Sequence, residues 1–372
     1  MKILQLGKAY PPVNLGGVEV VIALLTEGLN NAGYECDALG VNDTYSFVEE
    51  RGRFGGKIFR TKLIIKAFST LLSTQLISYL NNIKNNYDII HIHSPDPMAA
   101  LALYFCKPKA KVVLHWHSDI LKQKLLLFFY NPLLNWLLKR ADLVIATSPT
   151  YIEGSKYLIK HKNKTAVLPI GIDVNKQGQP MSLGEARVKE YKGKKIIFSL
   201  GRLAYYKGFE YLVLAALYLP ENFIIVIAGE GNEKDRLWSL IKENNLFDKV
   251  KLIGKVTEEA KQWYFENSAL FALSSIYKTE AYAIVQVEAM AYGLPIVSTQ
   301  IAGSGVDWVN QNGHTGLTVP IKDEKAIASA ISTILNDNEL LANFKKNASE
   351  RYNTMFTLDR MIVQQIELYH TL

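Results

Sequence analysis

Apolar and polar positions along the chain follow two alternating patterns. Short apolar runs have the composition of buried strands, and between them lie longer stretches whose apolar residues recur with the helical period. In the first half the expected strands are residues 2–7, 35–41, a segment near 58–59, 88–93, 111–114 and 142–146. In the second half they are residues 195–200, 223–228, 250–253, 269–273 and 295–297. This alternation predicts parallel sheets covered by helices, an α/β fold.

The length of 372 residues exceeds one usual hydrophobic core and predicts two domains. A Gly/Gln/Pro-rich stretch at residues 177–180 is the expected boundary, giving domains of residues 1–178 and 179–355. The helical period also predicts a long helix over residues 63–83 and a final helix within residues 356–372. The apolar stripe of the first of these is expected to face the core.

The stretch from Glu280 to Gly293 combines a buried strand end, a turn and the amino end of a short helix. Free N–H groups at residues 281–284, together with the positive end of the helix dipole, suit a phosphate. Glu280 and Glu288 stand about 12 Å apart if the segment is helical, so they could hold two ends of one elongated ligand. The alternative is a surface turn, but Glu288 lies among apolar neighbours and needs a partner.

Two cations follow the strand at residues 195–200. Arg202 offers a planar fork for phosphate oxygens, and Lys207, five residues on, offers a mobile point charge. The alternative is a pair of solvated surface cations. Gly16 and Gly17 likewise sit between the first strand and the first helix, where open α/β sheets bind ligands, although a plain tight turn would use the same residues.

Four histidines lie in pairs at two strand ends, His91 with His93 and His115 with His117. Side chains two apart on a strand share a face, so the four could form a zinc site, which makes a metal-dependent sugar hydrolase the rival enzyme class. No carboxylate or cysteine completes the set at a familiar spacing, and we therefore expect no metal and no other cofactor.

Composition narrows the class of protein. Cys36 and Cys106 form neither a metal spacing nor a disulfide framework, which indicates a reducing compartment. We find no signal peptide and no apolar run long enough to span a bilayer. Residues 1–184 carry 21 basic and 13 acidic residues against 21 and 22 in the remainder, so anionic partners are expected there. Nucleic acid is ranked well below them because no recognised binding motif is present.

The spacing of Glu280 and Glu288, before an Ala-Met-Ala-x-Gly-x-Pro ending, resembles the signature of the retaining glycosyltransferases of family four. Gly-Gly-x-Glu at residues 16–19 and Pro-x-Gly-Ile-Asp at residues 169–173 match the same family, in the family's order. The resemblance implies a GT-B fold, with two Rossmann-like domains facing each other across a cleft that binds a nucleotide sugar. It also implies that the last helix returns to the N-terminal domain.

The resemblance assigns roles to individual residues. Glu280 and His117 would meet the donor sugar, Glu288 the ribose, and Gly17 a donor phosphate. The backbone N–H groups that would bind the diphosphate belong to Ala281, Tyr282, Ala283 and Ile284, where the family often has Gly at the two alanine positions. Arg202 and Lys207 would stabilise the leaving group. Asp119 is a candidate acceptor contact, with a solvated turn residue as the alternative reading.

The opening residues 8–19 and the basic first half are similar to bacterial enzymes that extend O-antigen units on undecaprenyl diphosphate. The expected reaction is α-1,3 transfer of N-acetylgalactosamine from its UDP donor to a polyprenyl-diphosphate-linked saccharide. GDP-mannose or another UDP-hexose is the alternative donor, and a non-enzymatic scaffold on the same fold is the alternative class. The expected location is cytoplasmic, on the inner face of the plasma membrane.

Residues 121–140 form the segment that we expect to contact the membrane. This stretch is apolar on all sides, contains aromatic residues and carries Lys122, Lys124, Lys139 and Arg140 at its ends. An anionic membrane surface attracts such a patch, by about 1 kcal/mol per cation. We therefore expect peripheral binding through the N-terminal domain.

Overall fold

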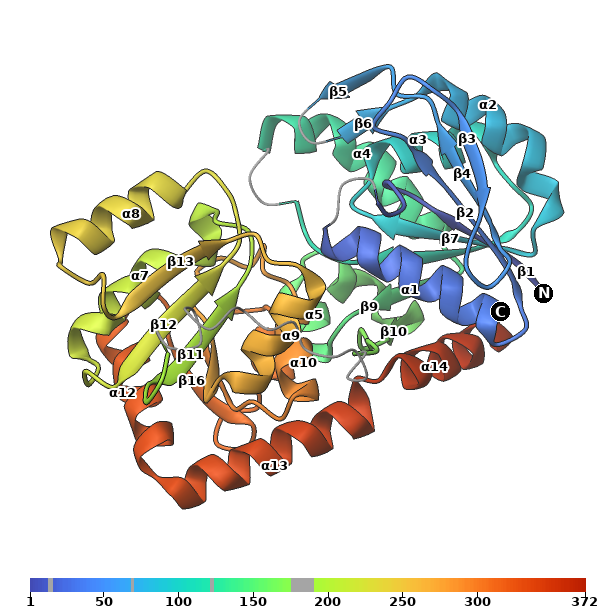
Figure 1. Cartoon of the computed structure of the whole chain (residues 1–372). Coiled ribbons are helices and arrows are strands. Elements are labelled where there is room, and N and C mark those ends of the chain that lie inside the picture. Colours follow the sequence, from blue (N-terminus) through green and yellow to red (C-terminus); the bar gives the residue numbers. More distant parts are fainter. Residues whose placement is uncertain (13–15, 68–69, 121–123, 175–190) are drawn as a thin grey trace. The chain divides into compact units, whose positions relative to one another are not determined.

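The computed structural model describes residues 1–12, 16–67, 70–120, 124–174 and 191–372, which form two compact units (Figure 1). The first unit comprises residues 1–171 and 358–372, and the second comprises residues 172–357. The expected boundary at residue 178 lies outside the described residues. Within the described chain, the second unit begins at Ile172 and ends at Thr357.

The first unit is built on an eight-stranded sheet in the order β10-β9-β8-β7-β1-β2-β4-β3. Its neighbouring strands are parallel except for the pair of β3 and β4. The strands are β1 (Lys2–Leu6), β2 (Glu35–Val41), β3 (Val48–Arg51), β4 (Lys57–Thr61), β7 (Ile89–Ser94), β8 (Lys111–Trp116), β9 (Leu143–Ala146) and β10 (Thr165–Val167). The strand order reverses between β1 and β7, and in open α/β sheets ligands bind at the carboxyl ends beside such a reversal.

Six α-helices are described in the first unit: α1 (Gly17–Asn31), α2 (Thr74–Ile83), α3 (Pro97–Cys106), α4 (Lys124–Arg140), α5 (Pro149–Gly154) and α14 (Leu358–His370). The start of α3 illustrates how the sequence sets a helix boundary. The Asp96 carboxylate accepts hydrogen bonds from the N–H groups of Met98 and Ala99, and Pro97 occupies the first turn. Both features are favoured at helix starts.

The prediction of a long helix over residues 63–83 is wrong for the first half of that range. Residues Ile65–Ala67 (β5) and Thr70–Leu72 (β6) form an antiparallel pair, and only Thr74–Ile83 is helical. The hydroxyl of Ser73 accepts a hydrogen bond from the N–H of Leu76 and so starts α2 at this point. β-Branched residues in both strands favour extended backbone. The apolar residues of the segment also recur with the helical period, and this is why the sequence predicted a helix there.

The second unit contains a six-stranded parallel sheet in the order β13-β12-β11-β14-β15-β16. Its strands are β11 (Lys195–Leu200), β12 (Phe223–Ala228), β13 (Val250–Gly254), β14 (Leu270–Leu273), β15 (Ile296–Gln300) and β16 (Gly316–Pro320). The α-helices are α7 (Phe209–Ala215), α8 (Lys234–Glu243), α9 (Glu258–Asn267), α10 (Ile284–Ala291), α11 (Val306–Val309), α12 (Glu324–Asn336) and α13 (Asn338–Met355). Here the strand order reverses between β11 and β14.

The C-terminal helix α14 packs against α1 within the first unit (Figure 1). Gly28 on α1 makes this close approach possible, because a Cβ there would lie 2.4 Å from Cδ1 of Ile362. The buried face of α14 includes Met361, Gln365 and Tyr369. Tyr369 bonds to His91 of β7, so the last helix contributes a polar group to the interior of the first unit.

Candidate active site

The reversal of strand order in the second unit brings two segments together that are far apart in the sequence. β11 and β14 are parallel neighbours, so the residues that follow each strand lie at the same edge of the sheet. Gly201 and Arg202 follow β11, and Ser274 and Ser275 follow β14. The Oγ of Ser274 donates to the backbone carbonyl of Lys207 over 3.0 Å, which joins the two segments.

Lys207 and Glu280 form a buried ion pair at this edge. Each residue is only 8% exposed, and Nζ of Lys207 contacts Oε2 of Glu280. The Oγ of Ser275 donates to the same carboxylate oxygen over 2.9 Å. Burial by itself lowers the pKa of Lys207, but the Glu280 carboxylate and Tyr206 together outweigh it and raise the pKa above its usual value. Lys207 is therefore a permanent cation held next to a carboxylate.

Gly208 shows why this turn can form. Its φ is +61°, a conformation that L side chains rarely adopt, and an added Cβ would lie 2.2 Å from the carbonyl oxygen of Ser274. Glycine therefore allows the segment after β11 to approach the segment after β14. The Lys207 side chain then passes over Gly201, where a Cβ would lie 3.2 Å from Cε of Lys207.

Arg202 differs from Lys207 in its surroundings. It is exposed, and no ion pair joins it to any residue that the structure describes. Its positive charge nevertheless lowers the pKa of Lys207, although this effect is the smallest of those that act on the Lys207 ammonium. The two cations expected from the sequence thus lie near each other, with one fixed by Glu280 and the other available to an anion.

The turn between Glu280 and α10 has the geometry of an anion site. α10 begins at Ile284, and Ala283 before it has φ +62° and ψ +73°. The N–H of Gly305 donates to the carbonyl of Ala281 over 2.8 Å, which fixes the turn from the outside. The N–H groups of Ala283 and Ile284 form no hydrogen bond with the described residues and lie at the positive end of α10.

Glu288 has the partner that its apolar sequence neighbours required. Its Oε1 lies 2.7 Å from Nζ of Lys261 on α9, and Lys261 also pairs with Glu258 over 2.7 Å. Burial lowers the pKa of Lys261, and the two carboxylates more than offset this and raise it. Sequence reasoning did not find Lys261, because a single lysine on an amphipathic helix carries no local signal of a pairing with a residue on another helix.

The four histidines lie together in the interior of the first unit. In the parallel register of β7 and β8, His93 faces His115, and none of the four is more than 7% exposed. Burial lowers the pKa of each below its usual value, to about 3 for His115. The four rings are therefore neutral near pH 7, and His117, a predicted donor-sugar contact, is not an acid at that pH.

The histidines bond to one another. His91 Nε2 lies 3.2 Å from His115 Nδ1, and His93 Nδ1 lies 2.9 Å from His117 Nε2. Among the described residues, one group with metal-ligand chemistry is found, in which nitrogens of His91, His93 and His115 lie within 4.8 Å of one another. These nitrogens have the right chemistry for a metal, but two of the three histidines are already joined by a hydrogen bond.

Asp119 is buried, and the reading of it as a solvated turn residue is wrong. Its side chain is 7% exposed, and Oδ1 accepts hydrogen bonds from Trp116 Nε1 over 3.0 Å and Ser155 Oγ over 2.7 Å. Its N–H donates to the hydroxyl of Tyr151 over 2.6 Å. These contacts give Asp119 a structural role that ties the end of β8 to α5.

Among the remaining candidates, Gly17 is the first residue of α1 and follows Gly16, the residue before the helix. Within the second unit the structure brings together Arg202, Lys207, Glu280 and residues 281–284. Gly17, His117 and Asp119 belong to the first unit.

Each unit contains a helix-covered, mainly parallel sheet with a reversal of strand order, as do the two Rossmann-like domains of the GT-B fold. Residues 15–176 match the family model described as Glycosyltransferase Family 4, and residues 185–351 match the model described as Glycosyl transferases group 1. The O-antigen chain mannosyltransferase C of Escherichia coli is 30% identical over 375 residues, which cover 100% of this chain and 99% of that protein. The chain therefore belongs to the family-four glycosyltransferases.

Two further comparisons extend this result. A Campylobacter jejuni enzyme described as N-acetylgalactosamine-N,N'-diacetylbacillosaminyl-diphospho-undecaprenol 4-alpha-N-acetylgalactosaminyltransferase is 31% identical over 221 residues, 59% of this chain and 58% of that enzyme. The crystal structure of Anabaena HepE in complex with UDP has a TM-score of 0.78 and 20% identity, covering 100% of both chains. The latter likeness concerns the fold.

Proposed function

We propose that the chain transfers a sugar, with retention of configuration, from a UDP-sugar to a polyprenyl-diphosphate-linked saccharide. The observation that carries this proposal is the anion site of the second unit. There the buried Lys207–Glu280 pair, the exposed Arg202 and the N–H groups at the start of α10 lie at one edge of the sheet. This arrangement suits a ligand with a sugar at one end and a diphosphate beside it.

In the proposed reaction the bond between the anomeric carbon and the phosphate oxygen breaks, and the diphosphate leaves with the electron pair. Arg202, Lys207 and the N–H groups of residues 281–284 stabilise the charge that develops on it. A hydroxyl oxygen of the acceptor forms the new bond on the face from which the diphosphate departs. Its proton passes to the departing phosphate oxygen, so no protein base and no metal takes part in the step.

Other residues complete the proposed donor site. Glu280, held by Lys207 and Ser275, binds sugar hydroxyls with its carboxylate. Lys261 holds Oε1 of Glu288, which leaves Oε2 for the ribose hydroxyls. Lys261 thereby becomes a positioning residue for the nucleotide.

The identity of the substrates is the finer part of the proposal. We assign UDP-N-acetylgalactosamine as donor, α-1,3 as linkage and O-antigen or a related polysaccharide as product. The Campylobacter relative, which is named for N-acetylgalactosaminyl transfer to a diphospho-undecaprenol acceptor, supports the donor sugar and the carrier. HepE in complex with UDP supports the nucleotide. The E. coli relative is named a mannosyltransferase, which keeps GDP-mannose as the second candidate donor.

An acceptor of this kind places the enzyme at a membrane, and we propose peripheral contact through α3 and α4. No helix in the described ranges is long and apolar enough to cross a bilayer. Phe128 and Phe129 on α4 are 71% and 72% exposed, and Phe105 on α3 is 61% exposed. Tyr104 and Trp136 join the two helices by an edge-on ring contact at 4.9 Å. Exposed aromatic residues beside cations suit the headgroup region of a bilayer.

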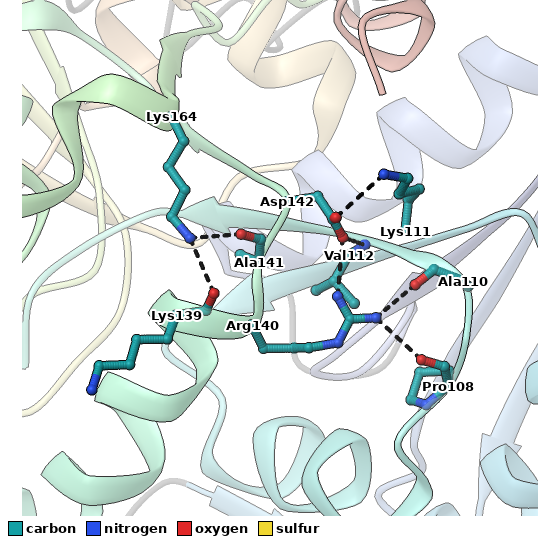
Figure 2. Close-up of polar contacts among 9 residues, drawn as sticks. All are labelled: Pro108, Ala110, Lys111, Val112, Lys139, Arg140, Ala141, Asp142 and Lys164. Carbon is teal, nitrogen blue, oxygen red and sulfur yellow. Dashed lines mark hydrogen bonds and ion pairs between the residues drawn. The ribbon is translucent and has the colours of Figure 1, made fainter.

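The cations of this surface differ from those expected, as Figure 2 shows. Arg140 pairs with Asp142 over 3.0 Å and donates to the carbonyls of Pro108 and Ala110. Arg140 therefore joins the end of α4 to the segments that precede β8 and β9 and is not a free membrane contact. The Lys139 side chain extends away from this cluster and is exposed. Lys122 lies outside the described residues, as does the side chain of Lys124.

The direct test measures transfer with purified enzyme. UDP-N-acetylgalactosamine, other UDP-hexoses and GDP-mannose are each offered with a synthetic polyprenyl-diphosphate N-acetylhexosamine, with and without EDTA. We expect transfer from the UDP donor, unchanged by EDTA, and an α linkage in the product. Arg202→Ala should reduce turnover by about a hundredfold, the usual loss when one charge-stabilising donor is removed. Loss of activity in EDTA with recovery on adding zinc would favour the histidine metal site instead.

A further inference from the structure

Gln5, next to the last residue of β1, lies fully buried between the histidines and α14. Its Oε1 is 2.8 Å from Nε2 of His93, and its Nε2 is 3.4 Å from the hydroxyl of Tyr369 and 3.7 Å from Sγ of Cys36. All three polar groups of the amide, one acceptor and two N–H donors, thus have partners. Rotating the amide by half a turn would leave one of its N–H groups facing His93 and the other without a partner. A buried unpaired donor is costly, so the arrangement with Oε1 toward His93 is favoured.

This arrangement fixes the protons of two histidines. Because Oε1 of Gln5 only accepts, His93 must carry its proton on Nε2. A neutral imidazole has one donor and one acceptor, so Nδ1 of His93 accepts from His117. His117 therefore carries its proton on Nε2, the nitrogen that lies 2.9 Å from His93. Its other ring nitrogen, Nδ1, has a free lone pair and no hydrogen-bond partner among the described residues.

We infer that Gln5 is a positioning residue which, through His93, holds His117 in the Nε2–H tautomer, so that Nδ1 of His117 accepts a hydrogen bond from a sugar hydroxyl. The sugar part of this inference rests on the proposed function, whereas the tautomer does not. An acceptor nitrogen at this place selects a hydroxyl-bearing ligand, because a ligand without the hydroxyl leaves the nitrogen unpaired. Without Gln5, His117 could turn its N–H outward and would no longer match that hydroxyl.

A second chain of hydrogen bonds supplies a matched control. The hydroxyl of Tyr369 bonds to Nδ1 of His91, and Nε2 of His91 bonds to His115. This chain meets Gln5 through the amide nitrogen, on the side away from His93. Tyr369→Phe removes one partner of that nitrogen and keeps Cys36 as the other, so Oε1 of Gln5 stays directed at His93. Gln5→Leu removes the acceptor for His93 with little change of volume.

The test is the tautomer of His117, measured by long-range proton–nitrogen NMR on ¹⁵N-labelled protein at pH 7.5. His117→Gln identifies its signals. We expect a protonated Nε2 and an unprotonated Nδ1 in wild type and in Tyr369→Phe, and a mixture of tautomers in Gln5→Leu. A protonated Nδ1 in the wild-type protein would overturn the inference without any variant. Signals of Gln5→Leu identical to those of wild type would overturn the role of Gln5.

Activity provides a separate readout. With the donor found in the transfer assay, kcat/KM of Gln5→Leu should fall by about tenfold, the loss expected when one hydrogen bond is no longer directed at the ligand. Tyr369→Phe, which keeps Oε1 of Gln5 toward His93, should retain near wild-type kcat/KM. If no donor supports transfer, the proposed function fails while the NMR result stands. If transfer occurs but kcat/KM of Gln5→Leu equals that of wild type, the hydroxyl contact at His117 is wrong.

Discussion

At the scale of single residues, the ion pair of Lys207 and Glu280 changes what a substitution at the site should do. Inspection of the sequence alone suggests that Lys207→Ala removes a phosphate contact and leaves the fold intact. In the structure, both charges are buried, so removing Lys207 leaves the Glu280 carboxylate without its cation. Breaking one half of a buried pair costs about 3–5 kcal/mol.

We therefore expect Lys207→Ala to lower the free energy of unfolding by about 3 kcal/mol or more. Lys207→Met combined with Glu280→Gln removes both charges and should recover most of that stability. Both proteins should be inactive, because the double variant still lacks the leaving-group cation. Urea denaturation and the transfer assay measure the two effects. Equal stability of Lys207→Ala and wild type would show that the pair contributes nothing to the fold.

Ala283 is a second residue whose importance depends on its backbone. Its φ of +62° places a Cβ in the left-handed region, which costs roughly 1–2 kcal/mol for a residue other than glycine. Ala283→Gly removes this strain but increases the freedom of the unfolded chain, so we expect a Tm equal to or slightly above that of wild type. The matched change Ala289→Gly, inside α10, should lower stability by about 1 kcal/mol. A loss at Ala283 as large as that at Ala289 would contradict the strain argument.

At the scale of elements, β7 and β8 make stability depend on pH through their histidines. Burial lowers the pKa of all four, from 6.5 to about 3 in the case of His115. Below pH 6.5 the unfolded chain therefore binds protons that the folded protein excludes, so stability is complete above that pH and is lost as the pH falls toward about 3. Denaturation at pH 7.5 and 5 should show this loss, and His115→Gln should reduce it. His314→Asn, at an exposed histidine of the second unit, should leave the difference unchanged.

Helices α3 and α4 account for the predicted membrane contact. Leu134, Leu137 and Leu138 of α4 are buried, because this side of the helix covers β8 and packs on α3. Phe128 and Phe129 of the same helix are exposed. The apolar residues of α4 therefore exceed what one core-facing stripe requires, as the sequence predicted.

We expect the protein to float with anionic liposomes at low salt and less at high salt, since each cation contributes about 1 kcal/mol. Phe128→Ser with Phe129→Ser should abolish flotation, and Lys139→Gln should weaken it. The matched control is Trp238→Ser with Phe247→Ser, which removes a pair of exposed aromatic residues from the second unit and should have no effect. Arg140→Gln is unsuitable because it would unfasten α4. Equal flotation of the Phe128/Phe129 variant and wild type would exclude this surface.

At the scale of the whole molecule, the first unit contains the basic part of the chain, and the second unit contains the part in which acidic and basic residues balance. The excess of basic residues lies within residues 1–184, and the proposed acceptor contact lies in the first unit, where α3 and α4 expose their aromatic residues. The proposed anion site for the donor lies in the second unit, where acidic residues balance the basic ones. This division agrees with a membrane-bound acceptor in one unit and a freely diffusing nucleotide sugar in the other.

The sequence by itself determined much of this protein. The strands at residues 35–41, 195–200 and 223–228 were predicted with correct ends. For residues 223–228 the reason is a continuous apolar run, which is the local signal of a buried parallel strand. The family was likewise readable from Glu280 and Glu288, since their spacing and the adjoining glycine turn lie within one short segment.

Only the tertiary structure decided which side chains act on each other. Lys207 with Glu280, Lys261 with Glu288, and Gln5 with His93 are pairs from separate elements, and no local pattern links their members. The same holds for Arg140 and the carbonyls of Pro108 and Ala110, which precede β8, and for the hairpin of β5 and β6. Contacts of this kind depend on which elements the fold places side by side. The sequence therefore shows which chemical groups are present, and the packing of the sheets and helices determines which of them interact.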